Sequence, residues 1–224
     1  CQWEQIKDRR YIYAASFVFG LSLSHHHVIL FLVPALAYWF IIHKKLFQKH
    51  WSIGLLVYWI IGLLPYMYLP IAGAGSSIIN WNRPVDIPSF IQLVTRADYG
   101  TFVSSGFYGT LLPQRIVQLK AYGQFLLLDL TVVGIFFAVF GFWRLWRADR
   151  KLFWFFIIAL IFLGPLFFFY ASFPLVNRFT LGTYERFLLP SYVLISVVIG
   201  VGFWQSIVLV GIIARRLKSR MYIF

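Results

Sequence analysis

Three consecutive histidines, His25 to His27, stand between two apolar stretches and could carry chemistry. Imidazoles ligate metals, bind substrates and transfer protons near neutral pH. On one helix, three consecutive side chains point about 100° apart, so one metal ion could not take all three. A metal site would need a further ligand, for which Asp86, Asp98 and Glu185 are candidates. The alternatives are polar lining of a ligand cavity and a structural turn.

A carboxylate, Asp129, lies inside the apolar run LLLDLTVV. Placing a charged side chain at the centre of a spanning helix costs about 2.5–3.5 kcal/mol on insertion scales, so an acid at this depth indicates a functional site. The alternative is a protonated or paired carboxylate that faces a neighbouring helix, with Arg186 or a histidine as its partner.

Cationic residues also lie between the apolar runs. Glu185 and Arg186 precede the last run, while Arg83, Arg96 and Tyr99 lie in the longest polar segment. A guanidinium can bind phosphate through two parallel hydrogen bonds, so each arginine could take an anionic substrate or a lipid headgroup. The sequence contains no HExxH, Gly-rich phosphate loop or serine-nucleophile motif, so the catalytic residues stay unknown.

The composition indicates a membrane protein. Of the 224 residues, 61% are hydrophobic and 12% are charged, whereas a soluble domain has about 25% charged residues. The net charge is +13, but the basic residues form short clusters between apolar runs, which is typical of topology signals rather than of a nucleic-acid site. The six apolar runs cover approximately residues 11–24, 28–42, 51–71, 121–143, 152–173 and 187–213. We therefore expect an all-α polytopic membrane protein with about six transmembrane helices and no nucleic-acid partner.

The first two runs are short, about 15 residues each, or about 22 Å as helix against a hydrocarbon core of about 30 Å. We expect them to form a hairpin whose histidine tip stops below the far surface and faces protein or water. Most of the 20 Lys and Arg residues lie on one set of connecting segments. The positive-inside rule then predicts that both ends are cytoplasmic and that the histidines lie on the outer or lumenal face.

The polar segment 72–119 is predicted to form a cap on that outer face. Within it, DIPSFIQLVTRADYG has a start signal at Asp86 and Pro88, apolar residues at helical spacing, and a stop signal at Gly100. This pattern predicts a short amphipathic helix that lies on the membrane, closes over a cavity or only packs. We expect residues 1–224 to form one membrane domain. Because Cys1 replaces the usual Met, we interpret the chain as a fragment of a larger catalytic unit.

Three stretches resemble one known family: GLSLSHHHVILFLVPAL at 20–36, the segment 68–102, and ERFLLPSYVL at 185–194. They are similar to the membrane family that includes the transmembrane protein O-mannosyltransferase of plexin-type receptors, which is assigned to the type C glycosyltransferase superfamily. The positions of the family's Asn-His-His motif fall on His25, His26 and His27, so the first position departs from it. The further matches are Trp81, Pro84, Arg96, Tyr99, Gly100 and Arg186, whereas Asp129 has no counterpart.

The resemblance implies a multipass enzyme that takes a mannose-like sugar from a polyprenyl- or dolichyl-phosphate donor in the membrane lipid. It implies transfer to a hydroxyl of a protein, or of another acceptor, on the outer or lumenal face of a bacterial inner membrane or the endoplasmic reticulum. The donor pocket would be lined by His26, His27 and Arg186. The catalytic carboxylate would lie upstream of Cys1. No cofactor would be needed, with a divalent metal as the alternative.

Two rival functions stay open. A transporter or flippase for a lipid-linked or small anionic substrate would use Asp129 and the histidine tip as polar groups near the membrane midplane. A non-catalytic membrane scaffold would use the same residues for stability alone.

Overall fold

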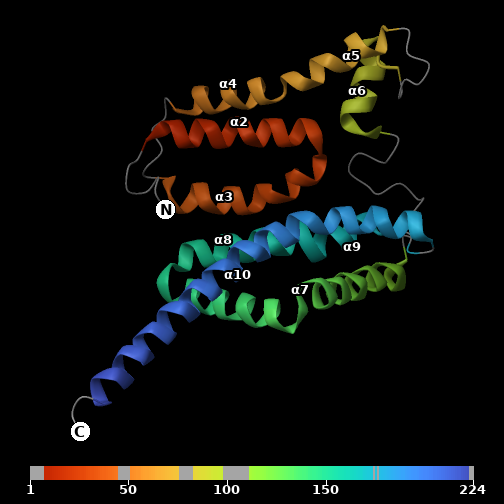
Figure 1. Ribbon diagram of the computed structural model, residues 1–224. Coiled ribbons are helices and arrows are strands. Elements are labelled where there is room, and N and C mark those ends of the chain that lie inside the picture. Colours follow the sequence, from red (N-terminus) through yellow and green to blue (C-terminus); the bar gives the residue numbers. More distant parts are fainter. Residues whose placement is uncertain are drawn as a thin grey trace. The chain divides into compact units, whose positions relative to one another are not determined.

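The structure is a computed structural model that describes residues 8–44, 51–75, 83–97, 111–173, 175 and 177–221, with side chains as far as Arg215. Within these ranges every regular element is helical, and no strand is present (Figure 1). Three helical stretches are long and apolar enough to cross a membrane: Leu112–Ala148, Arg150–Ala171 and Arg178–Arg215. A bent pair, Trp51–Gly62 with Leu64–Gly73, is a fourth candidate. The all-helical, membrane-type fold is confirmed, while the count of about six spans stays a prediction.

The chain divides into two compact units. Unit 1 comprises Cys1–Val33 and Phe40–Tyr108, and unit 2 comprises Pro34–Trp39 and Gly109–Phe224. The elements of the first half of the chain are α2 (Arg9–His25), η1 (His27–Leu32), α3 (Val33–Ile42), α4 (Trp51–Gly62), η3 (Leu64–Met67), α5 (Tyr68–Gly73) and α6 (Ile87–Thr95). The second half contains α7 (Leu112–Ala148), α8 (Arg150–Ile161), η5 (Phe162–Leu166), α9 (Phe167–Ala171) and α10 (Arg178–Met221).

In unit 1, α2 and α4 lie side by side because two glycines let their backbones meet (Figure 1). A Cβ atom on Gly20 would stand 2.3 Å from the carbonyl oxygen of Trp59. The contact is reciprocal, since a Cβ on Gly62 would stand 2.3 Å from the carbonyl oxygen of Phe17. Small residues at such a crossing allow close van der Waals packing, which stabilises helix pairs in lipid.

The helix that begins at Trp51 bends just beyond this crossing. The two parts of the pair are bent by 41°, and Pro65 is the second residue of the second part, which begins at Leu64. Proline lacks an N–H and its ring clashes with the preceding turn, so it interrupts a continuous helix. The bend brings the hydroxyl of Tyr66 within 2.9 Å of the carbonyl oxygen of Leu23, near the end of α2.

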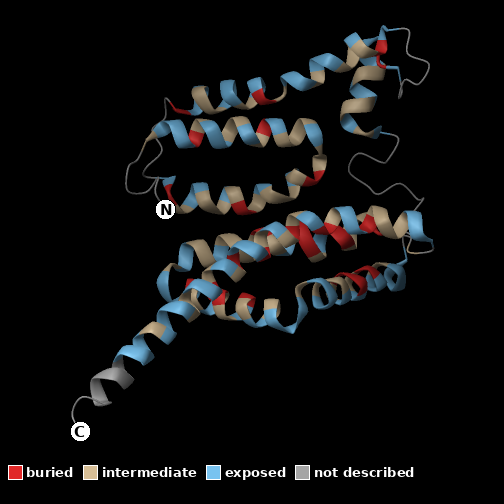
Figure 2. Ribbon diagram, in the orientation of Figure 1, coloured by how far each residue is buried: buried red, intermediate tan, exposed pale blue. Residues whose placement is uncertain are grey.

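Unit 2 is built around α10, whose inner face is almost fully buried. Tyr184, Leu188 and Ser191 of α10 and Phe168 of α9 are each at most 1% exposed (Figure 2). The ring of Tyr184 lies 4.4 Å from that of Phe168, between centroids. These contacts give the unit an aromatic core where α9 meets α10.

Side chains of α7 satisfy backbone carbonyls around the end of α9. Arg115 Nη1 donates to the carbonyl oxygen of Phe169 at 2.8 Å, and Gln118 Nε2 donates to that of Phe173 at 2.6 Å. The last carbonyls of a helix have no partner within the helix, so they need donors of this kind. Tyr184 then donates to the backbone oxygen of Gln118 at 2.8 Å, which links α7 to α10.

Both α7 and the α8–α9 segment are irregular in the middle. Thr131 interrupts α7 with φ 58° and ψ 173°. Gly164, followed by Pro165, lies in a π-helical turn, and a Cβ on Gly164 would stand 2.4 Å from the hydroxyl of Tyr122. Such interruptions in spanning helices are frequent at functional positions.

Candidate functional site

The three histidines do not share one helix but lie at the turn between two helices, where the sequence analysis expected the tip of a hairpin. His25 is the last residue of α2, His26 is extended with φ −151° and ψ 125°, and His27 begins η1. The chain turns here because Nδ1 of His26 accepts a hydrogen bond from the N–H of Val28 at 3.2 Å, which caps the new helix. Among the residues that the structure describes, no group of three or more His, Cys, Asp or Glu side chains is arranged to hold a metal ion.

His27 contacts Tyr66, a residue that sequence reasoning missed. The Tyr66 hydroxyl lies 3.3 Å from Nε2 of His27, and the two rings are stacked. Because this hydroxyl donates its one proton to the carbonyl of Leu23, we assign it as the acceptor from His27 Nε2–H. The Nδ1 atom of His27 is buried without a hydrogen-bond partner among the described residues, and the backbone of Val94 lies near the ring.

The short helix α6 begins where the sequence placed it but ends earlier. Asp86 accepts a hydrogen bond from the Ser89 N–H at 2.8 Å, and these two residues form a capping box. Hydrogen bonds from Ser89 hold the pKa of Asp86 below its usual value. Arg96 adopts a left-handed conformation, with φ 53° and ψ 41°, and ends the helix at Thr95. The carboxylate of Asp86 therefore caps α6.

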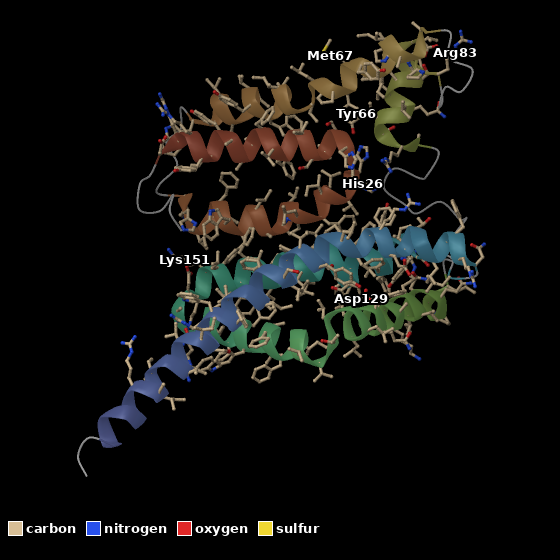
Figure 3. All side chains as sticks on the ribbon, viewed as in Figure 1. His26, Tyr66, Met67, Arg83, Asp129 and Lys151 are labelled. Carbon is tan, nitrogen blue, oxygen red and sulfur yellow. The ribbon has the colours of Figure 1, made fainter. Side chains whose placement is uncertain are left out.

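Arg96 brings a permanent positive charge to the histidine tip. Its charge acts on both His26 and His27. Burial first, and then the charge of Arg96, lower the pKa of His26 to about 4. His26 lies between α2 and η1, outside the segments that qualify as spans. We call His26, His27, Tyr66 and Arg96 the histidine–arginine cluster; Figure 3 shows the first and third of these side chains at the same end of unit 1. At neutral pH the cluster has uncharged His26 beside a cation.

Titration of His26 by NMR is expected to give a pKa near 4. The value in the folded protein lies below that of a free histidine, about 6.5. The contribution of uncharged His26 to the free energy of unfolding is therefore fully present above about pH 6.5. It decreases as the pH falls toward about 4, because the unfolded chain takes up a proton first. Replacing Arg96 by glycine should raise this pKa, while burial keeps it below 6.5. An unchanged pKa would show that Arg96 does not act on His26.

The other candidates of unit 1 lie around α6. Arg83 is exposed and has φ 33°, and the following Pro84 contacts Gly73 at the end of α5 (Figure 3). Nothing in its contacts identifies a ligand. Tyr99 lies outside the described residues, as do Trp81, Asp98 and Gly100.

Glu185 and Arg186 lie within the last helix and not before it, which corrects the sequence analysis. The helix α10 begins at Arg178 because the Asn177 side chain accepts a hydrogen bond from the Thr180 N–H at 2.9 Å. Both Glu185 and Arg186 are exposed. The structure thus places these two in unit 2, with Asp129, and the histidines in unit 1.

Asp129 is paired with a residue that the sequence did not suggest. The hydroxyl of Tyr192, on α10, donates to its carboxylate, in place of the expected Arg186 or histidine. Tyr192 can reach it because α7 and α10 pack along each other. Asp129 lies two residues before the interruption at Thr131 and is exposed.

The chain is similar to known protein O-mannosyltransferases. It is 29% identical over 212 residues to the Protein O-mannosyl-transferase TMEM260 of Mus musculus, which covers 88% of the chain and 29% of that relative. It is 24% identical over 210 residues to the Protein O-mannosyl-transferase tmem260 of Dictyostelium discoideum, which covers 87% of the chain and 25% of that relative. The chain spans between a quarter and a third of the length of these relatives. No family model and no solved structure matches it. The similarity is consistent with a relation to glycosyltransferases, and the assignment to the type C superfamily stays a prediction.

Proposed function

We propose that this chain is part of a membrane-embedded glycosyltransferase. It would transfer a mannose-like sugar from a polyprenyl- or dolichyl-phosphate donor to a hydroxyl of a protein, or of another acceptor, on the outer or lumenal face. The names of both relatives support sugar transfer to protein oxygen, and the apolar helices support a membrane setting.

The histidine–arginine cluster is the observation that carries this proposal. A lipid phosphate gains negative charge as it leaves the sugar, and a positioned cation stabilises that charge. Arg96 supplies a guanidinium that can form two parallel hydrogen bonds to phosphate oxygens. His26 is uncharged at neutral pH because its pKa is lowered to about 4, so it favours polar groups such as sugar hydroxyls over anions. These are binding roles, and the catalytic base is not assigned to a residue of this chain.

His27 complements this arrangement. Its Nε2 atom contacts the hydroxyl of Tyr66, and its buried Nδ1 atom makes no hydrogen bond to a described residue. A buried polar atom without a partner costs free energy until a ligand supplies one. A hydroxyl group of the sugar would satisfy it, which makes Tyr66 a residue that positions His27.

The test is a transfer assay in membranes that contain the protein at its full natural length. We expect label to pass from a radiolabelled polyprenyl-phosphate mannose to protein. Replacing Arg186 by alanine should lower turnover at least about tenfold, or about 1.4 kcal/mol, if this arginine neutralises the leaving phosphate as the resemblance implies. Arg178→Ala is the matched control, because Arg178 is an exposed arginine of the same helix. Normal turnover in a correctly folded Arg186→Ala protein would remove Arg186 from the site, and no transfer from any lipid-linked sugar would refute the enzyme.

A transporter or flippase for a lipid-linked or small anionic substrate is the second candidate. It is favoured by interruptions in candidate spanning segments, among them the 41° bend before Leu64 and the break at Thr131. Interrupted spanning helices commonly form substrate sites in transporters. Movement of a labelled lipid-linked sugar across vesicles without any transferred product would favour this function over the first.

A further inference from the structure

The surface of α7 around Asp129 consists mainly of exposed aliphatic side chains. Leu128, Val132 and Val193, which neighbour the Asp129–Tyr192 pair in the sequence, are 73%, 83% and 64% exposed. Asp129 follows Lys120 by nine residues, which is about 13 Å along a helix, and this places it well inside a hydrocarbon core of about 30 Å. Lipid tails would suit the aliphatic side chains but not the carboxylate.

Among the described residues, no cationic side chain contacts the carboxyl group of Asp129. Within the described residues, the carboxyl group of Asp129 accepts a single hydrogen bond, from Tyr192, and forms no ion pair. One neutral hydroxyl leaves most acceptor positions of the carboxylate unused. A buried or lipid-facing charge normally has an opposite charge beside it.

The break at Thr131 places the carboxyl end of the first half of α7, and the amino end of the second half, near Asp129. Thr131 is β-branched and has a positive φ of 58°, a conformation that such residues rarely adopt. The first half of α7 therefore ends close to Asp129. The carboxyl end of a helix carries a partial negative charge, so an acid there is unfavourable and a cation is favoured. Strained backbone of this kind is typical of positions where another group is bound.

We propose that this surface binds a membrane-spanning helix that carries a basic side chain, Arg or Lys, at the depth of Asp129. Charge complementarity determines the position of that side chain, and Leu128 and Val132 would pack against the apolar residues around it. A small metal ion fits less well, because it needs about six oxygen ligands, whereas Asp129 and Tyr192 together offer three. The inference does not depend on glycosyl transfer.

The experiment uses the protein at its full natural length in lipid nanodiscs. Benzoyl-phenylalanine introduced at Val132 would photo-crosslink to a fluorescent, synthetic 23-residue Leu-Ala helix of about spanning length with one central Arg. We expect about tenfold more crosslinking with this helix than with the same helix carrying a central Leu, and loss of the difference in Asp129→Asn. Asparagine keeps the size of the side chain and can still accept from Tyr192, so the fold should survive.

A second variant, Tyr192→Phe, separates charge from packing. It retains the carboxylate, so the preference for the Arg helix should persist. Equal crosslinking by the Arg and Leu helices in the wild-type protein would overturn the proposal, and so would a preference that survives Asp129→Asn or disappears in Tyr192→Phe. Thermal stabilisation by Na⁺ that requires Asp129 would assign the site to a small cation instead. Crosslinking between copies of the protein in place of the Arg helix would assign the surface to self-association.

Discussion

Replacing Gly141 by valine is expected to separate α7 from α10 and to destabilise unit 2 by about 3 kcal/mol. A Cβ atom at this position would stand 2.1 Å from the backbone oxygen of Val198, and a backbone cannot rotate away as a flexible side chain can. The crossing is reciprocal, because a Cβ on Gly202 would stand 2.1 Å from the carbonyl oxygen of Phe137. The two helices would have to move apart along much of their contact.

The measurement is thermal or detergent-induced unfolding, followed by circular dichroism. Gly200→Val is the matched control, because it makes the same change in a spanning helix at a position where a Cβ would meet no atom within 4 Å. The cost of valine in a helix is then equal in both proteins, and the difference measures the crossing. Equal losses for the two variants would contradict the close approach at Gly141.

These glycine contacts mark the limit of what the sequence predicts. Apolar run length predicts spanning helices well, because lipid requires every backbone group to be bonded within its own segment. Which glycine faces a neighbouring backbone depends on helix pairing, which has no local signal. Gly141 and Gly200 therefore look alike in the sequence and differ entirely in their surroundings.

Capping residues in the sequence predicted some of the helix ends and not others. Asp86 starts α6 as expected from Asp86 and Pro88, and the structure adds Ser89 as its partner in the capping box. The sequence analysis placed the carboxyl end of α6 too late, at Gly100. The helix ends at Thr95 because Arg96 adopts the left-handed conformation. The start of α10 had a readable signal, Asn177 followed by Thr180, but the polar residues after it suggested a loop.

The candidate site was predicted in part. The histidines and Arg96 were both identified from their residue types, and the resemblance includes them as well. Tyr66 was missed because it joins His27 over 39 positions of the sequence, a contact that only the bend at Pro65 creates. The pairing of Asp129 with Tyr192 over 63 positions was missed for the same reason.

Removal of the Arg96 side chain is expected to lower kcat for sugar transfer about a hundredfold. Deleting one preorganised donor to a developing negative charge typically costs about 10²–10³ in kcat. Glycine is the better replacement, because Arg96 has φ 53° and alanine would add strain in this left-handed conformation. Arg96→Lys should give an intermediate rate, since it keeps the charge but loses the planar fork.

The ratio of the two kinetic constants distinguishes the roles of Arg96. Stabilisation of the leaving phosphate in the transition state predicts that kcat and kcat/KM fall together. A rise in KM at constant kcat would instead assign Arg96 to uniform binding of the donor phosphate. Arg178→Ala controls for the loss of one exposed cation from the protein. If Arg96→Gly and Arg178→Ala had equal rates, the histidine–arginine cluster would not be the donor site, and the transporter hypothesis would gain weight because it requires no leaving phosphate.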